Sequence, residues 1–351
     1  MLIPFEDSLS FKKKLDKYSR PLFLFDDDAD GVCSFLMLYR YFDGGAGVIV
    51  KGNPELQASY LNMVTEHRPD CIIILDKPLV SEDFFKGTNL PIFWLDHHEL
   101  QQPSKSFYLN PKTYLPNEAS STSSVVWDIL TTDNNLDKAQ FEWLCLLGAI
   151  SDWDLRPINN LDVSLASLIG NGDKGVEDIL FNSRLGLAIK IINFNLKGKK
   201  HEAMKSIKAM NNLVGIFDLL DNSSDASVYL HKKYKIINDE YELIKSGVSG
   251  SSENPVLTFK YDSDVASITA ELSNELIYLN PDKIVLVARP HRKRYLCSLR
   301  SKKLDISDTV SGVAEKYGGY GGGHKNACGA SIPIDYFDLF VEELTREIEN
   351  A

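Results

Sequence analysis

The sequence has few cysteines, no long hydrophobic run and no excess of positive charge. Its five cysteines are scattered along 351 residues without a C-x-x-C pair, which excludes a disulfide framework and a zinc knuckle. No segment reaches the roughly 18 consecutive apolar residues of a membrane span, and the N-terminal residues lack the apolar core of a secretion signal. We therefore expect a cytoplasmic protein that works in a reducing compartment without membrane contact.

The net charge of -11 argues against a protein that coats long nucleic acids non-specifically. Two short basic islands remain, one around Gly198 and one from Arg292 to Arg294, and we interpret both as solvated surface. Hydrophobic residues make up 44% of the chain, so it can bury a large core. The length predicts about two domains.

Apolar, strand-like runs alternate with helix-like segments from Pro21 to about Ser183. The runs PLFLF, GVIV, CIIIL and PIFWL give the βαβ signature of a parallel sheet. Residues 184–247 show helical periodicity, and strand candidates return in PVLTFKY, KIVLVA and RYLCSLR. The sequence thus predicts an α/β fold with a parallel-sheet domain at 1–183, a helical connector at 184–247 and a smaller mixed α/β domain at 248–351.

Acidic and histidine side chains follow several of these apolar runs. They are Asp26, Asp28 and Asp30 after PLFLF, Asp76 after CIIIL, Asp96, His97 and His98 after PIFWL, and Asp152 after LLGAIS. Ligands collect at the carboxyl ends of strands in open α/β sheets. Carboxylates and imidazoles that converge there repel or lose hydration unless a cation joins them. The sequence therefore predicts a metal site.

Each cluster also has an ordinary structural reading. DDDADG could be an aspartate-rich helix N-terminus, which the helix dipole favours, and Asp76 alone could be a strand-to-turn residue. Adjacent histidines on a strand face opposite ways, so at most one of His97 and His98 would share a metal with a given neighbour. The joint occurrence favours the metal. Oxygen and imidazole ligands without thiolate suit Mn²⁺ or Mg²⁺, and two ions about 3.5 to 4 Å apart would generate a hydroxide nucleophile and clamp a phosphoryl group.

These motifs resemble the four motifs of the DHH phosphoesterase family. DDDADG, the lone Asp76, the literal Asp96-His97-His98 and Asp152 occur in the family's order and at comparable spacing. SLRS and GGYGGGHKNACGAS resemble the DHH-associated substrate domain that follows in many members. The resemblance covers nearly the whole chain, and its two-domain motif set is specific.

The resemblance implies ligands for two Mn²⁺ ions, with Mg²⁺ as the alternative metal. Asp28 and Asp30 match the paired ligands of the first motif, one for each ion. Asp76 matches a carboxylate that bridges both ions, while His97 and Asp152 match the remaining ligands.

Further roles follow from the same resemblance, with one departure from the family pattern. Asp96 would orient an imidazole by accepting its N–H. His98 would contact the scissile phosphate or protonate the leaving group. Many members carry a histidine at the position of Leu24, and Asp26 could supply an oxygen ligand in its place, as in RecJ-type members with a D-x-D-x-D-G motif.

The segment from Gly318 to Gly329 holds six glycines in twelve residues. Because glycine is entropically costly in a packed helix or strand, we expect a loop whose N–H groups bind an anion. The resemblance implies that this loop and the arginine of SLRS hold the terminal phosphate or nucleotide of a substrate, with the connector as the hinge that closes the domains. The candidate substrate residues are Ser298, Arg300, Gly322, Gly323, His324, Lys325 and Asn326.

The leading interpretation is a Mn²⁺-dependent phosphodiesterase that releases 5′-mononucleotides from short single-stranded RNA or DNA, similar to the family's nanoRNases. The length and acidic charge of the chain favour this interpretation over a RecJ-like single-strand exonuclease. The D-x-D-x-D-G motif keeps the exonuclease as an alternative. A hydrolase of linear or cyclic dinucleotides or of adenosine 3′,5′-bisphosphate is a further alternative. A catalytically inert scaffold is disfavoured because the ligands are retained. Homodimer formation is left open.

Overall fold

The computed structural model describes residues 1–170, 172, 174–248, 254–263 and 266–350. The chain divides into two compact units, Met1–Tyr234 and Lys235–Ala351, each with its own hydrophobic core. Among the described residues, no helix combines the length and the apolar character that crossing a bilayer requires.

A parallel five-stranded sheet forms the centre of the first unit, with the strand order β2-β1-β4-β6-β7. The three central strands are buried on both faces, which explains their continuous apolar sequences. The strands are β1 (Pro21–Asp26), β2 (Ala46–Val50), β4 (Cys71–Leu75), β6 (Ile92–Leu95) and β7 (Phe107–Leu109), beside a small sheet of β3 (Glu55–Leu56) and β5 (Leu79–Val80).

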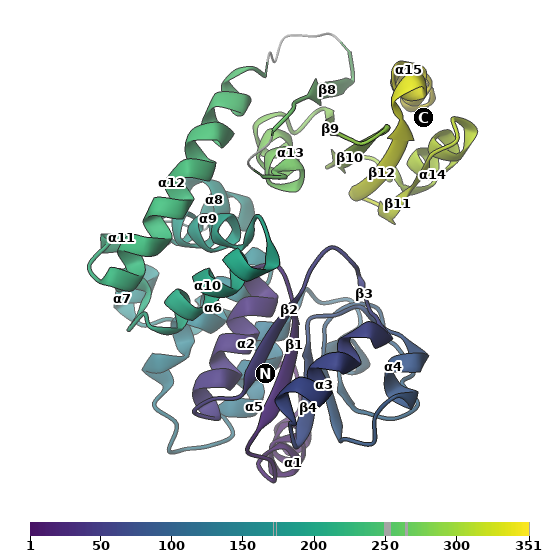
Figure 1. Cartoon of the computed structure of the whole chain (residues 1–351). Helices are drawn as coiled ribbons and strands as arrows, with labels where there is room; N and C mark the ends of the chain where they lie inside the picture. The colour runs from purple at the N-terminus through teal and green to yellow at the C-terminus, as the bar shows by residue number, and fades with distance from the viewer. Residues whose placement is uncertain (171, 173, 249–253, 264–265, 351) are drawn as a thin grey trace. The chain divides into compact units, whose positions relative to one another are not determined.

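Helices cover both faces of this sheet, and Figure 1 shows α2 and α3 on opposite sides of β1. Phe23 and Phe25 belong to the core that includes α2, α5 and α6, while Leu22 and Leu24 pack in a second cluster with α4. The alternation along β1 therefore serves two separate cores. The helices are α1 (Phe5–Leu15), α2 (Ala29–Tyr41), α3 (Leu61–His67), α4 (Glu82–Lys86), α5 (Thr122–Leu130) and α6 (Glu142–Ser151).

A helical region follows the sheet. Leu185 and Ile189 of α9 and Ile207 of α10 join the same core as α2 and α6, and the first unit ends inside α12 at Tyr234. Most of the segment assigned as a connector thus packs within the first unit, and its hinge role stays a prediction. The helices are α7 (Val163–Ala166), α8 (Val176–Asn182), α9 (Arg184–Leu196), α10 (Lys200–Asn211), α11 (Ile216–Asp221) and α12 (Asp225–Ser246).

The second unit is built on a mixed five-stranded sheet with the order β11-β12-β10-β9-β8. Only β8 and β9 pair in parallel, so the sheet is mixed as expected, and the predicted fold class is confirmed. Its elements are β8 (Val256–Lys260), α13 (Thr269–Leu279), β9 (Ile284–His291), β10 (Arg294–Ser301), α14 (Ser307–Lys316), β11 (Tyr320–His324), β12 (Ala327–Pro333) and α15 (Phe337–Glu349). Short 3-10 turns lie at Ala58–Tyr60, Pro111–Thr113, Lys138–Gln140, Arg156–Asn160 and Ile334–Tyr336.

Most of the glycine-rich segment lies in two paired strands, β11 and β12, so the expectation of a loop there is wrong. Residues Tyr320–His324 form β11 and pair with β12. A Cβ atom on Gly321 would lie 3.1 Å from Val310 of α14, and one on Gly323 would overlap the carbonyl oxygen of Ala327. Gly323 also has a φ of +149°, which other residues rarely adopt. The glycines therefore allow close packing of a strand.

Candidate metal centre

The three aspartates of DDDADG occupy the turn from β1 into α2. Asp26 is the last residue of β1, and Asp28 caps α2 by accepting the N–H of Gly31 at 2.9 Å. A Cβ atom on Gly31 would lie 2.8 Å from the carbonyl oxygen of Asp26, so glycine is required for this tight turn. Burial, reinforced by the negative charge of Asp76, raises the pKa of Asp26 to about 6.

Asp30 is fully buried in the first turn of α2, and α5 holds its carboxylate. Oδ2 accepts the backbone N–H of Thr122 at 2.6 Å, and Oδ1 accepts that of Ser123 at 2.8 Å. The first turn of a helix has free N–H groups and a positive dipole end, both of which suit a carboxylate. Burial, and then the charge of Asp76, still raises the pKa of Asp30 well above its usual value.

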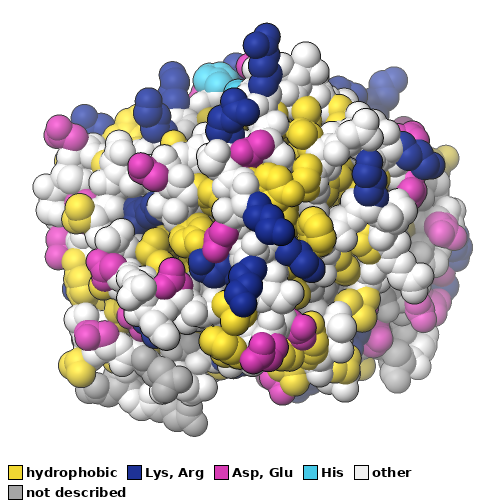
Figure 2. Space-filling view, turned by 90° about the horizontal axis from the view of Figure 1, so that it is seen from below, with side chains coloured by type: hydrophobic (Ala, Val, Ile, Leu, Met, Phe, Trp, Pro, Cys, Tyr) yellow, Lys and Arg dark blue, Asp and Glu magenta, His cyan; other side chains and the backbone are white. Residues whose placement is uncertain are grey.

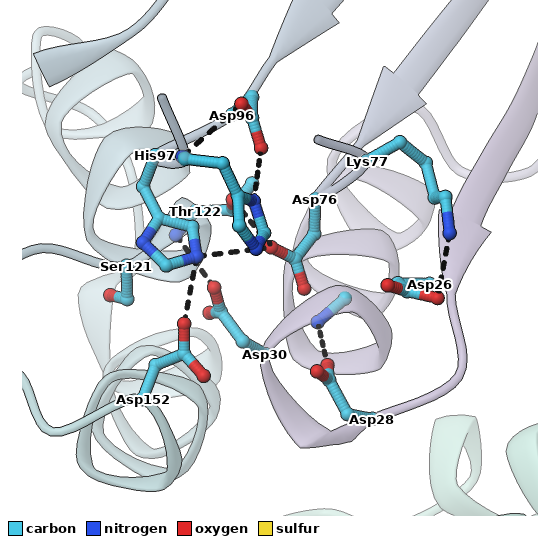
Figure 3. Close-up of polar contacts among 12 residues, drawn as sticks. Asp26, Asp28, Asp30, Asp76, Lys77, Asp96, His97, Ser121, Thr122 and Asp152 are labelled. Carbon is cyan, nitrogen blue, oxygen red and sulfur yellow. Dashed lines mark hydrogen bonds and ion pairs between the residues drawn. The ribbon is translucent and has the colours of Figure 1, made fainter. Parts of the chain in front are cut away.

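Asp76 follows β4 and lies at the centre of the site (Figure 3). Its φ of +59° is left-handed, a conformation that non-glycine residues seldom adopt and that clusters at functional sites. Thr122 Oγ1 donates a hydrogen bond to Asp76 Oδ1 at 3.2 Å. Burial alone would raise the pKa of this carboxyl, but contact with His97 and the charges of His97 and His98 lower it to about 2.

The ring of His97 lies between Asp76 and Asp152. Nε2 is 2.8 Å from Asp152 Oδ2 and 3.3 Å from Asp76 Oδ1. Neither of these contacts has the geometry of a hydrogen bond, so this buried nitrogen has no hydrogen-bond partner among the described residues. Burial would lower the pKa of His97, but the two carboxylates outweigh it and raise the pKa well above its usual value. A buried nitrogen pointed between two carboxylates in this way fits a cation ligand.

Three groups of ligand atoms meet at Asp76. In each group the candidate oxygen or nitrogen atoms lie within 4.8 Å of one another. The two main groups are Asp30, Asp76, His97 and Asp152 on one side, and Asp26, Asp28 and Asp76 on the other; the third is Asp76, His97 and His98. The donors of the two main groups are carboxylate oxygens and a single imidazole, which fit Mn²⁺ or Mg²⁺. A shared carboxylate between two groups is the arrangement of a binuclear site.

Asp96 and His98 form a pair beside the two main groups, and His98 also belongs to the third group. Asp96 is fully buried, and its Oδ1 lies 2.7 Å from Nδ1 of His98. The rings of His97 and His98 are 4.4 Å apart, so the expectation that they face opposite ways is wrong. Both residues lie beyond the end of β6, where the alternation of a strand no longer applies. His98 Nδ1 is also 3.9 Å from Asp76 Oδ1.

Three residues at the site were not among the sequence candidates. Lys77 contacts Asp26, and Thr122 and Ser123 hold Asp30. The run SSTSS at residues 120–124, just before VVW, is a helix-start signal that could have drawn attention to Thr122 and Ser123. For Lys77 we find no such signal beyond its position after Asp76.

The candidate substrate residues lie in the second unit. Arg300 of β10 donates from Nε to Asn274 Oδ1 at 2.6 Å and from Nη1 to Ser298 Oγ at 2.9 Å. Asn326 donates to the carbonyl oxygen of Ser301 at 2.8 Å, so its amide stabilises the β11–β12 turn. His324 and Lys325 are exposed at that turn.

Pairing across the sheet brings several of these residues into register. Arg300 and His324 both pair with Ala327, and Ser298 and Gly322 both pair with Gly329. The two rows are two residues apart and so lie on one face of the sheet. A Cβ atom on Gly322 would meet nothing within 4 Å, which leaves this part of the face open. Gly323 lies between Gly322 and His324, and its side-chain position faces the opposite way.

Comparison with solved structures shows the same fold at low sequence identity. RecJ from Thermus thermophilus in complex with Mn²⁺ gives a TM-score of 0.70 at 14% identity, covering all of this chain and 56% of that one. An exonuclease RecJ bound to manganese gives 0.62 at 13% identity, covering 99% of this chain and 95% of that one. A pGpG-specific phosphodiesterase from Vibrio gives 0.51 at 16% identity, covering 94% and 99%.

No curated protein sequence matches the chain. Two family models do match, and they fall on the two halves that the structure separates. The DHH family N-terminal domain matches residues 23–149, which span the strand ends at Asp26, Asp76 and Asp96. The DHHA1 domain matches residues 254–350, which span the mixed sheet of the second unit. The chain therefore belongs to the DHH family and carries a DHHA1 domain after its DHH domain.

Proposed function

We propose that this protein is a phosphodiesterase that depends on two divalent cations, Mn²⁺ or Mg²⁺, and releases 5′-mononucleotides from short oligonucleotides. The observation that carries the proposal is the pair of ligand groups that share Asp76. Cations held by these groups would activate a water molecule for attack on phosphorus and offset the charge of the phosphoryl oxygens. The RecJ structures that share this fold contain Mn²⁺, which supports the choice of metal.

Asp96 and His98 suit proton transfer to the leaving oxygen. Burial alone would lower the pKa of His98, but the hydrogen bond to Asp96 and its negative charge raise it. Because Asp96 holds Nδ1, Nε2 is the ring nitrogen left for a substrate. A protonated ring in this position can donate its proton to an alkoxide leaving group.

The open face of the second unit suits a terminal phosphate or nucleotide. Arg300 supplies a fixed guanidinium, and His324 lies in the same cross-strand row. A planar guanidinium recognises phosphate through paired N–H groups. Lys325 adds positive charge at the adjacent turn.

Charge supports a short substrate. The chain has a net charge of -11, and on the face that Figure 2 shows, Lys and Arg side chains are interspersed with Asp and Glu rather than forming one continuous track. Long single strands are usually held in a continuous basic groove. The pGpG-specific phosphodiesterase of similar fold acts on a dinucleotide, which fits the same reading.

A substrate panel with Mn²⁺ tests this function. We expect RNA of about two to five nucleotides to be degraded faster than single-stranded DNA of about thirty nucleotides, which would need a longer binding track. Adenosine 3′,5′-bisphosphate and cyclic dinucleotides complete the panel. Equal or faster processing of the long DNA would instead support a RecJ-like exonuclease, the second candidate, which the TM-score of 0.70 to RecJ favours. No hydrolysis of any substrate would contradict the proposal.

A further inference from the structure

Lys77 is a buried lysine at the edge of the candidate metal centre. Its side chain is 1% exposed, and Nζ lies 3.0 Å from Asp26 Oδ1. Nζ also donates to the carbonyl oxygen of Asn53 at 2.7 Å, while the carbonyl oxygen of Lys77 accepts from Trp94 Nε1 at 3.0 Å. Lysine is rarely buried unless it is paired, and here both ends of the residue are held. The ammonium group is therefore a fixed part of the site.

The lysine directly follows Asp76, just beyond the end of β4. The left-handed φ of +59° at Asp76 turns the chain out of the strand conformation at this point. Asp76 contacts His97 on one side, and Lys77 contacts Asp26 on the other (Figure 3). The chain thus places an anion and a cation side by side at the end of β4.

The ammonium group of Lys77 contacts a ligand of one of the two main groups. Asp26 belongs to the group with Asp28 and Asp76, and its Oδ1 atom accepts a hydrogen bond from Lys77 Nζ. Among the described residues, no Lys or Arg forms an ion pair with Asp30 or Asp152 of the other group. A buried ammonium repels a divalent cation strongly, because charges in this environment are poorly screened by water.

We propose that Lys77 is a positioning residue that makes the two cation sites unequal. It orients Asp26 through Oδ1 and offsets one negative charge, so the site of Asp26, Asp28 and Asp76 binds a divalent cation more weakly than the site of Asp30, Asp76, His97 and Asp152. The inference rests on the proposed two-cation function.

Titration of the metal-free protein with Mn²⁺ alone tests the inference without any substrate. Calorimetry gives both dissociation constants, and electron paramagnetic resonance of free Mn²⁺ counts the ions bound. We expect two binding events in the wild type, with dissociation constants that differ by about tenfold or more. Lys77→Gln and Lys77→Met should each tighten the weaker event by about tenfold and change the tighter event by less than about threefold.

Lys51→Met is the matched control. Lys51 Nζ lies 3.7 Å from Asp27 Oδ2, and Asp27 belongs to neither ligand group. This variant removes a charge of the same sign close to the site, and we expect both events to stay within about threefold of wild type. An effect equal to that of the Lys77 variants would show a general charge effect and overturn the positioning role.

Three further outcomes bear on the role of Lys77. Two equal binding events in the wild type, or a weaker event that is unchanged or weakened in folded Lys77 variants, would overturn the inference. If circular dichroism shows that neither Lys77 variant folds, the Asp26→Asn variant is titrated instead. Loss of the weaker binding event alone supports the assignment of Asp26 to the weaker site, and loss of the tighter event contradicts it. Failure of the proposed function gives a different result, namely no Mn²⁺ binding at all, or the expected binding without hydrolysis of any substrate.

Discussion

Asp96 Oδ1 and His98 Nδ1 lie 2.7 Å apart, and the second oxygen of Asp96 accepts the backbone N–H of His98 at 3.2 Å. The carboxylate therefore fixes both the ring and the chain that carries it. Asp96→Asn keeps the size of the side chain but removes the charge that raises the pKa of His98. We expect kcat to fall about 10–100-fold while the bound metal stays unchanged, as steady-state kinetics and metal analysis would show.

A control for this variant is Asn110→Ala, which removes a long contact of 3.4 Å to Asp96 Oδ2 and a hydrogen bond of 2.9 Å to the carbonyl oxygen of His98 but leaves the charged Asp96–His98 hydrogen bond in place. We expect a smaller decrease in kcat for this change. Wild-type kcat in Asp96→Asn would show that the charge of Asp96 has no part in the reaction.

His97→Ala should abolish Mn²⁺-dependent hydrolysis. The ring supplies the nitrogen between Asp76 and Asp152, and without it these carboxylates lose the imidazole that lies close to both. We expect a loss of more than about a hundredfold in kcat/KM, with an unchanged circular dichroism spectrum. His67→Ala removes an exposed histidine at the end of α3 and should behave as wild type. Activity retained in both His97→Ala and Asp76→Ala would contradict the two-cation assignment.

The sequence was sufficient to predict the strand ends of the site. Asp26, Asp76 and Asp96 each follow a continuous apolar run, and parallel strands bring such ends to one sheet edge, as the structure has it. Asp152 could be added because it follows an apolar helix. The prediction works here because the distances along the sheet are fixed by strand pairing.

Contacts across long sequence separations could not be predicted. The N–H groups that hold Asp30 belong to Thr122 and Ser123, whose position depends on how α5 packs against α2. The contact of Lys77 with Asp26 joins residues 51 positions apart, and no local pattern indicates the left-handed backbone at Asp76 beside it. The glycine-rich segment was assigned as a loop because glycine weakens strands, but Gly321 packs closely against α14, and Gly323 leaves no room for a Cβ atom beside the carbonyl oxygen of Ala327.

Arg300→Ala should raise KM without changing the metal content. The side chain lies in the second unit, where it is held by Asn274 and Ser298, and it belongs to no ligand group. We expect KM for a short oligonucleotide to rise about tenfold or more, because a charged hydrogen-bonding partner of phosphate is lost.

The control for this variant is Arg346→Ala, which removes an exposed arginine of α15 and should leave KM unchanged. Arg300→Lys tests the planar fork, since a lysine keeps the charge but cannot donate in the same paired geometry, and we expect only partial recovery. Wild-type kinetics in Arg300→Ala would remove this residue from the substrate site.

Two helical glycines should respond in opposite ways to alanine. Gly312 of α14 has open space around an added Cβ atom, so Gly312→Ala should stabilise the second unit by about 0.5–1 kcal/mol. Gly148 of α6 has no room for a side chain, because an added Cβ atom would overlap Ser123 Oγ and lie 2.9 Å from Asp30 Oδ1. We expect Gly148→Ala to destabilise the first unit by about 1–3 kcal/mol and to weaken Mn²⁺ binding, since the contact displaces the residues that hold Asp30. Urea unfolding followed with and without Mn²⁺ measures both effects, and a neutral Gly148→Ala would show that α6 and the start of α5 pack less closely than the structure has them.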